Sequence, residues 1–299
     1  MAFMRYKTTG YQWAVTYPAG EWKVLFGRGS EGVLIGEQGM VSSGPLTSFH
    51  SGFAARSAPY RQSSDGAVML EVSGGSWLTV FFRGDRSERL HWDRGVQREG
   101  AWTEEHTWGT LPGGFRSQID ALLKAPNAAD GHWQTYFFKG PRVLTLHWIS
   151  GVVRDALITE GPDASGCAGW ASLPEEFRSD LDHVIAYKPA ADGTRQSLLV
   201  KGAKGLLLNW KTGVLASGEL HQLGVPGLAA LPAEFRTALR PVTGRYTGTS
   251  GTNRVELRVD LEGERSLCTV SGDIFANGVY GGSFRTGAAL TVDQTADRY

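Results

Sequence analysis

The sequence predicts an all-β protein built as a propeller or a similar closed array, because one pattern of strand length occurs four times. Each copy reads Gly-x-x, four mostly apolar residues, one further residue, a cation and a second Gly, with eight residues from the first Gly to the cation. The copies start at Gly20, Gly75, Gly131 and Gly193, so successive starts are 55, 56 and 62 residues apart. Strand-like units that repeat at such a period are typical of propeller blades.

The agreement between copies continues beyond this first pattern. In three copies a Trp follows the cation by nine residues, and a Gly-Val pair begins three residues further on. These three copies also end with Leu-Pro-x-x-Phe-Arg, whereas the first copy is eroded and has Glu37 in place of the Trp. Because several residue spacings are identical in three copies, the repeat is not a chance match. The three tryptophans are Trp92, Trp148 and Trp210.

Each unit is expected to hold three or four short strands. In the third copy we expect an apolar strand within 115–124, a turn of small and polar residues over 125–131, and further strands over 132–139 and 143–148. A hairpin of such strands cannot bury both of its faces alone. Neighbouring units are therefore expected to stack until the ring closes.

The bulk composition narrows the range of functions. The chain has 30 cations and 30 anions, a balance that does not favour nucleic acid as the main partner. No apolar run is long enough to span a membrane, and the first residues lack the apolar core of a signal peptide. We therefore expect a cytoplasmic protein or one exported without a classical leader. Cys167 and Cys268 are the only cysteines, which provides neither a disulfide framework nor a cysteine-based zinc site.

Three segments of the third and fourth copies resemble a hemopexin-like repeat. They are Tyr-Phe-Phe-Lys-Gly at 136–140, Ile-Asp-Ala at 119–121 and Trp-Ala-Ser-Leu-Pro at 170–174. The resemblance covers roughly 8–240 and implies a four-bladed β-propeller with an axial channel. The implied blades are about 8–49, 50–115, 116–177 and 178–240.

The chain departs from that family in three ways. Its first copy is eroded, its second copy has extra residues between Phe49 and Gly75, and the ring-closing disulfide is absent. The last departure indicates a bacterial or plant-type relative held shut by strand pairing and packing. Since nothing in the repeat requires the extra residues 54–66, we expect this insertion to carry function.

The repeat pattern ends at Leu239, and a different pattern of residues follows. Residues 255–261 alternate between apolar and polar side chains, as in a strand with one buried face. Further strands are expected over 267–270, 279–284 and 288–292. Residues 241–299 are therefore predicted to form a small β-sandwich-like module, or the first part of a larger domain that continues beyond Tyr299.

Two carboxylates are candidates for a metal site. The resemblance implies a metal ion in the axial channel, held by backbone carbonyls and a nearby acidic side chain. Asp120 and Asp182 occupy equivalent positions in the third and fourth copies, and oxygen ligands suit calcium or another hard cation. The alternative is that each Asp caps a turn by accepting hydrogen bonds from its own backbone.

Two histidines are candidate ligands of a transition metal or haem. His91 and His147 are equivalent in the repeat, and imidazole suits both groups. However, Asn209 occupies the same position in the fourth copy, which favours a framework role. Haem is not expected, because the resemblance implies haem ligands from between two propellers and one propeller is predicted here.

Aromatic and cationic residues at repeat positions are candidates for ligand binding. Exposed tryptophans would offer platforms for sugars or cations, whereas buried ones would be wedges between blades, and their strict periodicity favours wedges. The cations of the repeat are expected to face solvent, although four around one rim would suit an anion. The residues are Trp22, Trp77 and Trp133, with Trp92, Trp148 and Trp210 as a second set, and Arg28, Arg83, Lys139 and Lys201 as the cations.

The sequence favours a binding protein over an enzyme. It contains no Gly-x-Ser-x-Gly, no His-Glu-x-x-His and no phosphate-binding Gly-x-x-x-x-Gly-Lys motif. We expect a non-catalytic module that recognises a protein or a surface glycan through propeller loops, within a longer polypeptide or an assembly. The alternatives are a hydrolase with its site at the channel mouth or at the domain junction, and a structural spacer within a larger assembly.

Overall fold

The computed structural model forms two compact units, 9–238 and a second unit of 1–8 with 239–299. It describes residues 11–17, 21–58, 60, 64–72, 76–101, 104, 106–116, 119–127, 130–163, 166–225, 227–236, 244–250, 253–262, 267–276 and 279–286.

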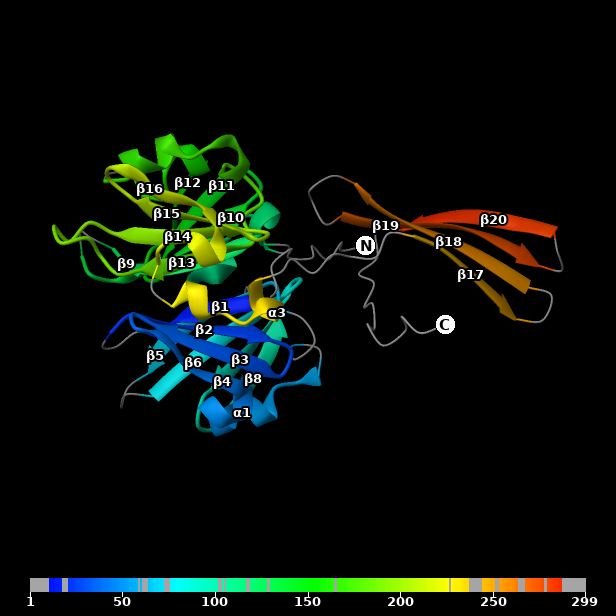
Figure 1. Ribbon diagram of the computed structural model, residues 1–299, viewed down its shortest axis with the longest axis horizontal. Helices are drawn as coiled ribbons and strands as arrows, with labels where there is room; N and C mark the ends of the chain where they lie inside the picture. Colours follow the sequence, from blue (N-terminus) through cyan, green and yellow to red (C-terminus); the bar gives the residue numbers. More distant parts are fainter. Residues whose placement is uncertain are drawn as a thin grey trace. The chain divides into compact units, whose positions relative to one another are not determined.

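The first unit is a four-bladed β-propeller, as the sequence predicts (Figure 1). Each blade is a four-stranded antiparallel sheet whose strands follow one another in chain order. Blade 1 contains β1 (Trp13–Thr16), β2 (Lys23–Arg28), β3 (Glu31–Gly36) and β4 (Gly39–Pro45). Blade 2 contains β5 (Gly66–Val72), β6 (Ser76–Arg83), β7 (Arg86–His91) and β8 (Gly95–Ala101). Blade 3 contains β9 (Ala121–Pro126), β10 (Trp133–Lys139), β11 (Arg142–His147) and β12 (Gly151–Leu157). Blade 4 contains β13 (His183–Tyr187), β14 (Gln196–Lys201), β15 (Lys204–Asn209) and β16 (Gly213–Glu219).

The ring closes by packing between blades. The first strand of each blade lies innermost, and β1, β5, β9 and β13 contact one another around the axis, with β13 returning to β1. Four apolar clusters fill the spaces between neighbouring blades. The cluster that joins blade 4 to blade 1 places Leu198 and Ile185 against Val24 and Phe26. This interface closes the propeller through apolar contacts of the kind that the sequence predicts.

The second Gly of the repeat has a conformational reason. Gly29, Gly84, Gly140 and Gly202 lie in the tight turns between the second and third strands, with φ of 57°, 61°, 53° and 62°. This left-handed conformation is costly for residues that carry a Cβ. The cation-Gly pair therefore marks one hairpin turn in every blade.

Short helical segments link the blades and pack on the outer hairpin of the next blade. In the linker of blades 1 and 2, the Gly52 N–H donates to the Trp92 carbonyl oxygen at 2.6 Å. The equivalent Gly169 N–H donates to the Trp210 carbonyl oxygen at 2.7 Å. These segments are α1 (Leu46–Phe49), η1 (Ser51–Ala55), η3 (His106–Thr110), η4 (Gly113–Phe115), η5 (Ile158–Glu160), η6 (Ala168–Ser172), η7 (Glu175–Phe177), η8 (Leu220–Gln222), η9 (Leu228–Ala230) and α3 (Ala233–Arg236).

The described residues of the insertion 54–66 contribute to packing between blades 1 and 2. Arg56 is buried, and its Nε lies 3.4 Å from Oε1 of the equally buried Glu88. Its guanidinium lies 3.9 Å from the centre of the Phe81 ring, and Tyr60 belongs to the same apolar cluster. Replacing either partner of this ion pair by an uncharged residue would leave the other as a buried charge without compensation. A binding role for the insertion stays a prediction.

The second unit contains one described sheet. Strands β17 (Gly244–Ser250), β18 (Asn253–Glu262), β19 (Leu267–Ala276) and β20 (Val279–Thr286) form a four-stranded antiparallel sheet in chain order. The strands expected over 255–261, 267–270 and 279–284 lie within β18, β19 and β20, whereas 288–292 lies outside the described residues. The sandwich-like arrangement stays a prediction, because the described strands form a single layer.

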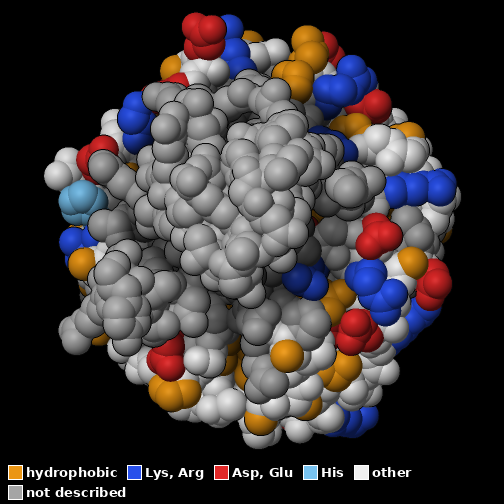
Figure 2. Space-filling view, turned by 90° about the vertical axis from the view of Figure 1, so that its right-hand side faces the viewer, with side chains coloured by type: hydrophobic (Ala, Val, Ile, Leu, Met, Phe, Trp, Pro, Cys, Tyr) orange, Lys and Arg blue, Asp and Glu red, His pale blue; other side chains and the backbone are white. Residues whose placement is uncertain are grey.

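None of the helices in the described part of the chain is long and apolar enough to cross a membrane. Figure 2 shows acidic and basic side chains interspersed over the described part of the face that it draws. No block of one charge dominates that part of the surface, in keeping with the balanced charge of the chain.

Candidate functional site

The two ends of the propeller axis differ in their side chains. We call the end of the axis at which the four innermost strands begin the turn end, and the other the cavity end. One polar residue precedes each innermost strand, and these residues are Gln12, Asp65, Asp120 and Asp182. At the cavity end, Tyr17 follows β1, while β9 and β13 end with Pro126 and Tyr187, and all three residues line a common cavity.

The polar side chains of the turn end hold the hairpin turns of their own blades. The Oδ2 atom of Asp120 accepts a hydrogen bond from the Gly140 N–H at 2.6 Å, and Asp182 accepts one from Gly202 at 2.8 Å. Asp65 does the same for Gly84 at 2.6 Å, while Oε1 of Gln12 accepts from Gly29 at 3.0 Å. All four blades thus use one side chain to satisfy the glycine N–H of the left-handed turn.

The two predicted metal ligands, Asp120 and Asp182, belong to this set of turn-binding side chains. Asp120 and Asp182 are 5 % and 2 % exposed, and each accepts a backbone N–H from a turn glycine 20 residues further along the chain. Among the described residues, no three His, Cys, Asp or Glu side chains are grouped so that they could hold a metal ion. Since calcium takes six to eight oxygen ligands, the two carboxylates would need backbone carbonyls or water to complete such a site. A channel metal stays a prediction.

The sequence analysis missed two members of this set. Gln12 and Asp65 lie 17 and 19 residues before their turn glycines, whereas Asp120 and Asp182 lie 20 residues before theirs. Counting backward from the cation-Gly pair, with an allowance of three residues, would have found them.

The predicted histidine ligands cap the turn between the third and fourth strands. Nδ1 of His147 accepts the N–H groups of the next two turn residues, at 3.3 Å from Ile149 and 3.2 Å from Ser150. Nδ1 of His91 accepts two equivalent N–H groups at 3.2 and 3.3 Å. In blade 4, Oδ1 of Asn209 takes the same place, with both distances 2.9 Å. An acceptor that Asn can replace fits a framework role and gives no support to haem or transition-metal ligation.

The tryptophans of the second set lie between blades and anchor their indole N–H groups. Nε1 of Trp92, Trp148 and Trp210 donates to the hydroxyls of Thr79, Thr135 and Ser197, at 2.8, 2.9 and 2.9 Å. Trp92 and Trp210 are buried, and Trp148 is half-buried. These three residues are therefore wedges and not open platforms for sugars.

The tryptophans of the first set have different surroundings. Trp22 is buried and its Nε1 donates to the Ala186 carbonyl oxygen at 2.8 Å, across the junction of blades 1 and 4. Trp77 is half-buried against the cluster of blades 1 and 2. Trp133 is half-buried as well, and it lines the axial cavity. Of the tryptophans that the sequence offers as candidates for ligand binding, Trp133 and Trp210 are lining residues of that cavity.

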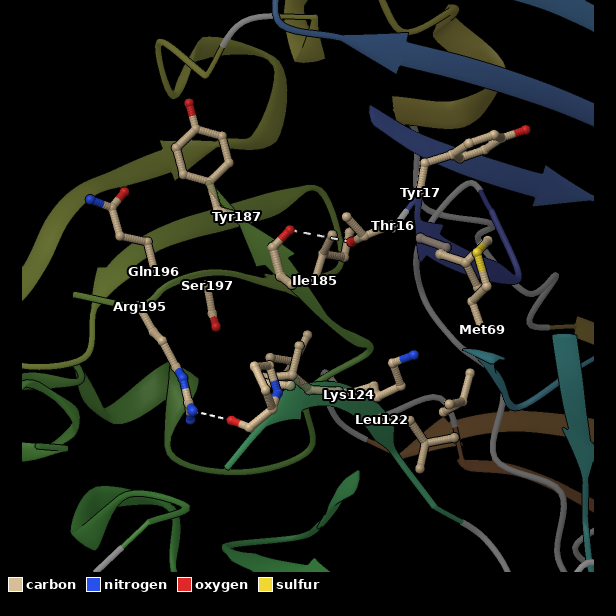
Figure 3. A pocket seen from close by; sticks show the side chains of 18 of the residues that line it. Thr16, Tyr17, Met69, Leu122, Lys124, Ile185, Tyr187, Arg195, Gln196 and Ser197 are labelled. Carbon is tan, nitrogen blue, oxygen red and sulfur yellow. Dashed lines mark hydrogen bonds between the residues drawn. The ribbon is translucent and has the colours of Figure 1, made fainter. Parts of the chain in front are cut away.

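The axial cavity has a volume of about 470 Å³, and residues of all four innermost strands line it (Figure 3). Its walls are mainly apolar, with Val15 from β1, Val68 and Met69 from β5, Leu122 from β9 and Ile185 from β13. Ligand sites are commonly concave, mostly apolar spaces of this size with a few placed polar groups.

Aromatic and cationic side chains line the mouth of the cavity. Tyr17 packs edge-on against Trp92 with ring centres 5.1 Å apart, and Tyr187 packs in the same way against Trp22 at 4.9 Å. The Lys124 ammonium lies 3.8 Å from the centre of the Trp133 ring. This distance is typical of a cation–π contact between an ammonium group and an indole ring. Figure 3 shows Lys124 and Arg195 on different sides of the space.

Arg195 at the mouth is tied to blade 3. Its NH1 donates to Oδ2 of Asp163 at 2.8 Å and to the Tyr136 hydroxyl at 3.2 Å. A further hydrogen bond goes to the carbonyl oxygen of Pro126. Burial raises the pKa of Asp163, while hydrogen bonds from Tyr136 and Arg195 oppose that rise. The arginine is thus fixed in place by an ion pair that spans two blades.

The rim tyrosines are neutral at physiological pH. Burial raises the pKa of Tyr17 to about 12, and burial also raises the pKa of Tyr187. Both phenols are therefore available as hydrogen-bond donors next to an apolar space.

Comparisons with known proteins assign neither a family nor a function to this chain. No protein-family model matches the chain, and no curated protein matches its sequence significantly. Among solved structures, BBS1N in complex with ARL6DN shares 7 % identity over 95 % of this chain and 83 % of its own, with a TM-score of 0.29. The WD40 domain of Pan2 from Neurospora crassa shares 8 % identity over 95 % and 75 %, with a TM-score of 0.27. A protein of unknown function from Bacteroides caccae shares 9 % identity over 92 % and 81 %, with a TM-score of 0.29.

Proposed function

We propose that this propeller is a non-catalytic binding module whose protein partner docks on the cavity end of the axis. The carrying observation is the apolar axial cavity with Tyr17, Trp133, Tyr187 and Arg195 at its mouth. The hemopexin-like resemblance is part of this proposal and rests on the repeat residues alone.

The composition of the mouth supports a protein partner. Trp, Tyr and Arg are the residues over-represented at the energetic centres of protein interfaces, where they surround or fill desolvated pockets. Here three aromatic side chains and one arginine surround a cavity that can accept an apolar group from a partner. The cavity is less complementary to a glycan, because the many hydroxyl groups of a glycan would contact walls that are mainly apolar.

The lining also supports binding over catalysis. None of the residues that line the cavity, all from the described part of the chain, is an Asp, Glu, His or Cys. These are the side chains that most often act as general acids, general bases or activated nucleophiles. The hydroxyl of Ser197 is engaged as the acceptor of the Trp210 indole N–H.

Site-specific photocrosslinking tests the proposal. The photoreactive residue p-benzoyl-phenylalanine would replace Tyr187 at the cavity end or the exposed Asp85 in the turn of β6 and β7. We expect a discrete crosslinked polypeptide from Tyr187 in the producing cells and none from Asp85. The purified partner should then bind the parent chain more tightly than a Tyr187→Ala variant. Equal crosslinking from both positions would contradict docking at the cavity end.

A further inference from the structure

We infer that the outermost strand of blade 4, β16, pairs antiparallel with β16 of a second copy of this chain, about a two-fold axis at Ser217. β16 has an open edge, lacks the residues that block strand addition in the other blades, and is complementary to itself. No residue of β16 lines the axial cavity, so this contact is separate from the proposed docking site at the cavity end.

The edge of β16 that faces away from β15 is open to solvent. β16 is the last strand of its four-stranded sheet, so within the described residues it pairs with β15 alone. Ser172 of the preceding linker contacts the start of the strand, where its Oγ accepts the Val214 N–H at 3.1 Å. Leu215 is 51 % exposed, and residues 217–219 are exposed as well. An open strand edge of this kind is a template for pairing with another chain.

The outermost strands of the other blades carry residues that hinder such pairing. β8 and β12 each contain a cation followed by an anion, which are Arg98 with Glu99 and Arg154 with Asp155. β4 ends with Pro45, which has no N–H to donate to a neighbouring strand. Charges and prolines on edge strands are common means of preventing strand addition. β16 has neither before Glu219, its last residue.

Two aliphatic side chains near the start of β16 are exposed. Val214 is 37 % exposed, and Leu215 is the extra residue of a β-bulge in this strand. Blades 1 and 3 have Val41 and Val153 at the same bulge, but their strands contain the blocking residues, and blade 2 has the polar Gln97. In β16 alone, exposed aliphatic groups therefore lie on an edge without such residues. Their burial against another chain is favourable.

The charge pattern of β16 suits a second copy as the partner. Antiparallel pairing about a two-fold axis at Ser217 places the two Ser217 residues face to face and the two Glu219 residues at opposite ends. At the register position of Ser217, blades 2 and 3 have Glu99 and Asp155. The same pairing of their strands would place identical charges directly opposite each other, which is unfavourable. Two-fold pairs are also the commonest form of oligomer.

Sedimentation velocity of the full chain over a range of concentrations tests this pairing. We expect the parent to shift from the mass of one chain to the mass of two as the concentration rises. Ser217→Glu places two carboxylates at the two-fold axis and should weaken the dimer at least tenfold. Ser43→Glu makes the same change at the equivalent exposed position of β4 and should leave the dimer unchanged.

Exchange of charge across the two-fold axis separates loss of pairing from loss of fold. Ser217→Lys alone should also weaken the dimer at least tenfold, whereas an equimolar mixture of Ser217→Glu and Ser217→Lys should restore it as a mixed dimer. A parent chain that stays monomeric at every concentration would overturn the inference and leave the edge to solvent or to another protein. A dimer that Ser217→Glu leaves intact, or that Ser43→Glu weakens equally, would overturn it too, as would a mixture that fails to restore pairing.

Discussion

The turn end and the cavity end of the axis are formed by the same four strands, yet their polar side chains do different work. At the turn end, every blade supplies an equivalent side chain that binds its own hairpin glycine, as Asp182 binds Gly202. At the cavity end, the blades differ from one another, and Lys124 and Arg195 are departures from the repeat. Side chains that occur at the same position of every blade therefore maintain the fold. Side chains that differ from those at the same position in the other blades are the candidates for function.

Removing a turn-end carboxylate should cause the largest loss of stability. Asp182→Ala leaves the Gly202 N–H without its charged acceptor, and we expect a loss of about 2 kcal/mol in the free energy of unfolding, because charge-assisted hydrogen bonds contribute about 1.5–3 kcal/mol. Urea denaturation measures this loss, and Asp182→Asn, which retains an acceptor, should lose less. If calcium stabilises the parent but not the Asp182→Ala variant, Asp182 does more than hold the turn, and the predicted metal site gains support.

The hairpin glycine should show a smaller effect. Gly140→Ala places a Cβ in open space, but φ of 53° remains unfavourable for alanine, so we expect a loss of about 1 kcal/mol. Gly113→Ala also adds a Cβ in open space, without a left-handed φ, and should leave the free energy of unfolding unchanged. Equal effects of the two substitutions in urea denaturation would argue against backbone strain as the reason for the repeated glycine.

Alkaline pH should destabilise the protein through its buried tyrosines at both ends. Burial raises the pKa of Tyr11, near the turn end, and that of Tyr17, at the cavity end, the latter to about 12. Above pH 10 the unfolded chain releases phenolic protons that the folded chain retains, so stability is full below pH 10 and falls from there toward pH 12. Tyr17→Phe should flatten this fall when unfolding is followed between pH 8 and 12. An unchanged slope would show that Tyr17 ionises as readily in the folded chain.

The outer-turn histidine should be the most replaceable of these residues. His147→Asn retains an acceptor for the two turn N–H groups, as Asn209 does in blade 4, but it loses the contact of Nε2 with Oδ2 of Asp130 at 3.0 Å. Because a pair with an exposed carboxylate contributes little, we expect a loss below about 1 kcal/mol. His147→Ala removes that acceptor and should cost more. Loss of a bound metal or haem on His147→Asn, seen by absorption spectroscopy of the purified protein, would contradict the framework role.

The blades could be predicted from the sequence because their determinants are local and repeated. The strand pattern, the turn glycine and the wedge Trp each have a fixed offset, so Gly140 and Trp148 identify a blade without any knowledge of tertiary contacts. The equivalence of His147 with Asn209 was likewise visible, and both side chains accept N–H groups of the turn that follows them.

The axial cavity could not be predicted in this way, because it depends on four strands that are far apart in sequence. Its space exists where small side chains such as Ala14, Ala67 and Ala186 approach the axis together. The burial of Arg56 was hidden for a similar reason, since its partner Glu88 lies 32 residues away in another element. Sequence spacing predicts what a strand contributes to its own blade, but not which side chains meet between blades.

The proposed site requires that the partner reaches the axial cavity. The most direct measurement is photocrosslinking from Tyr187 in the parent chain and in Ala14→Phe, in which a phenyl ring occupies the space between the innermost strands. We predict that the crosslink is strong in the parent and lost in Ala14→Phe, while both chains unfold at the same temperature. An undiminished crosslink in Ala14→Phe would show that the partner does not use the cavity, and would contradict the proposed site.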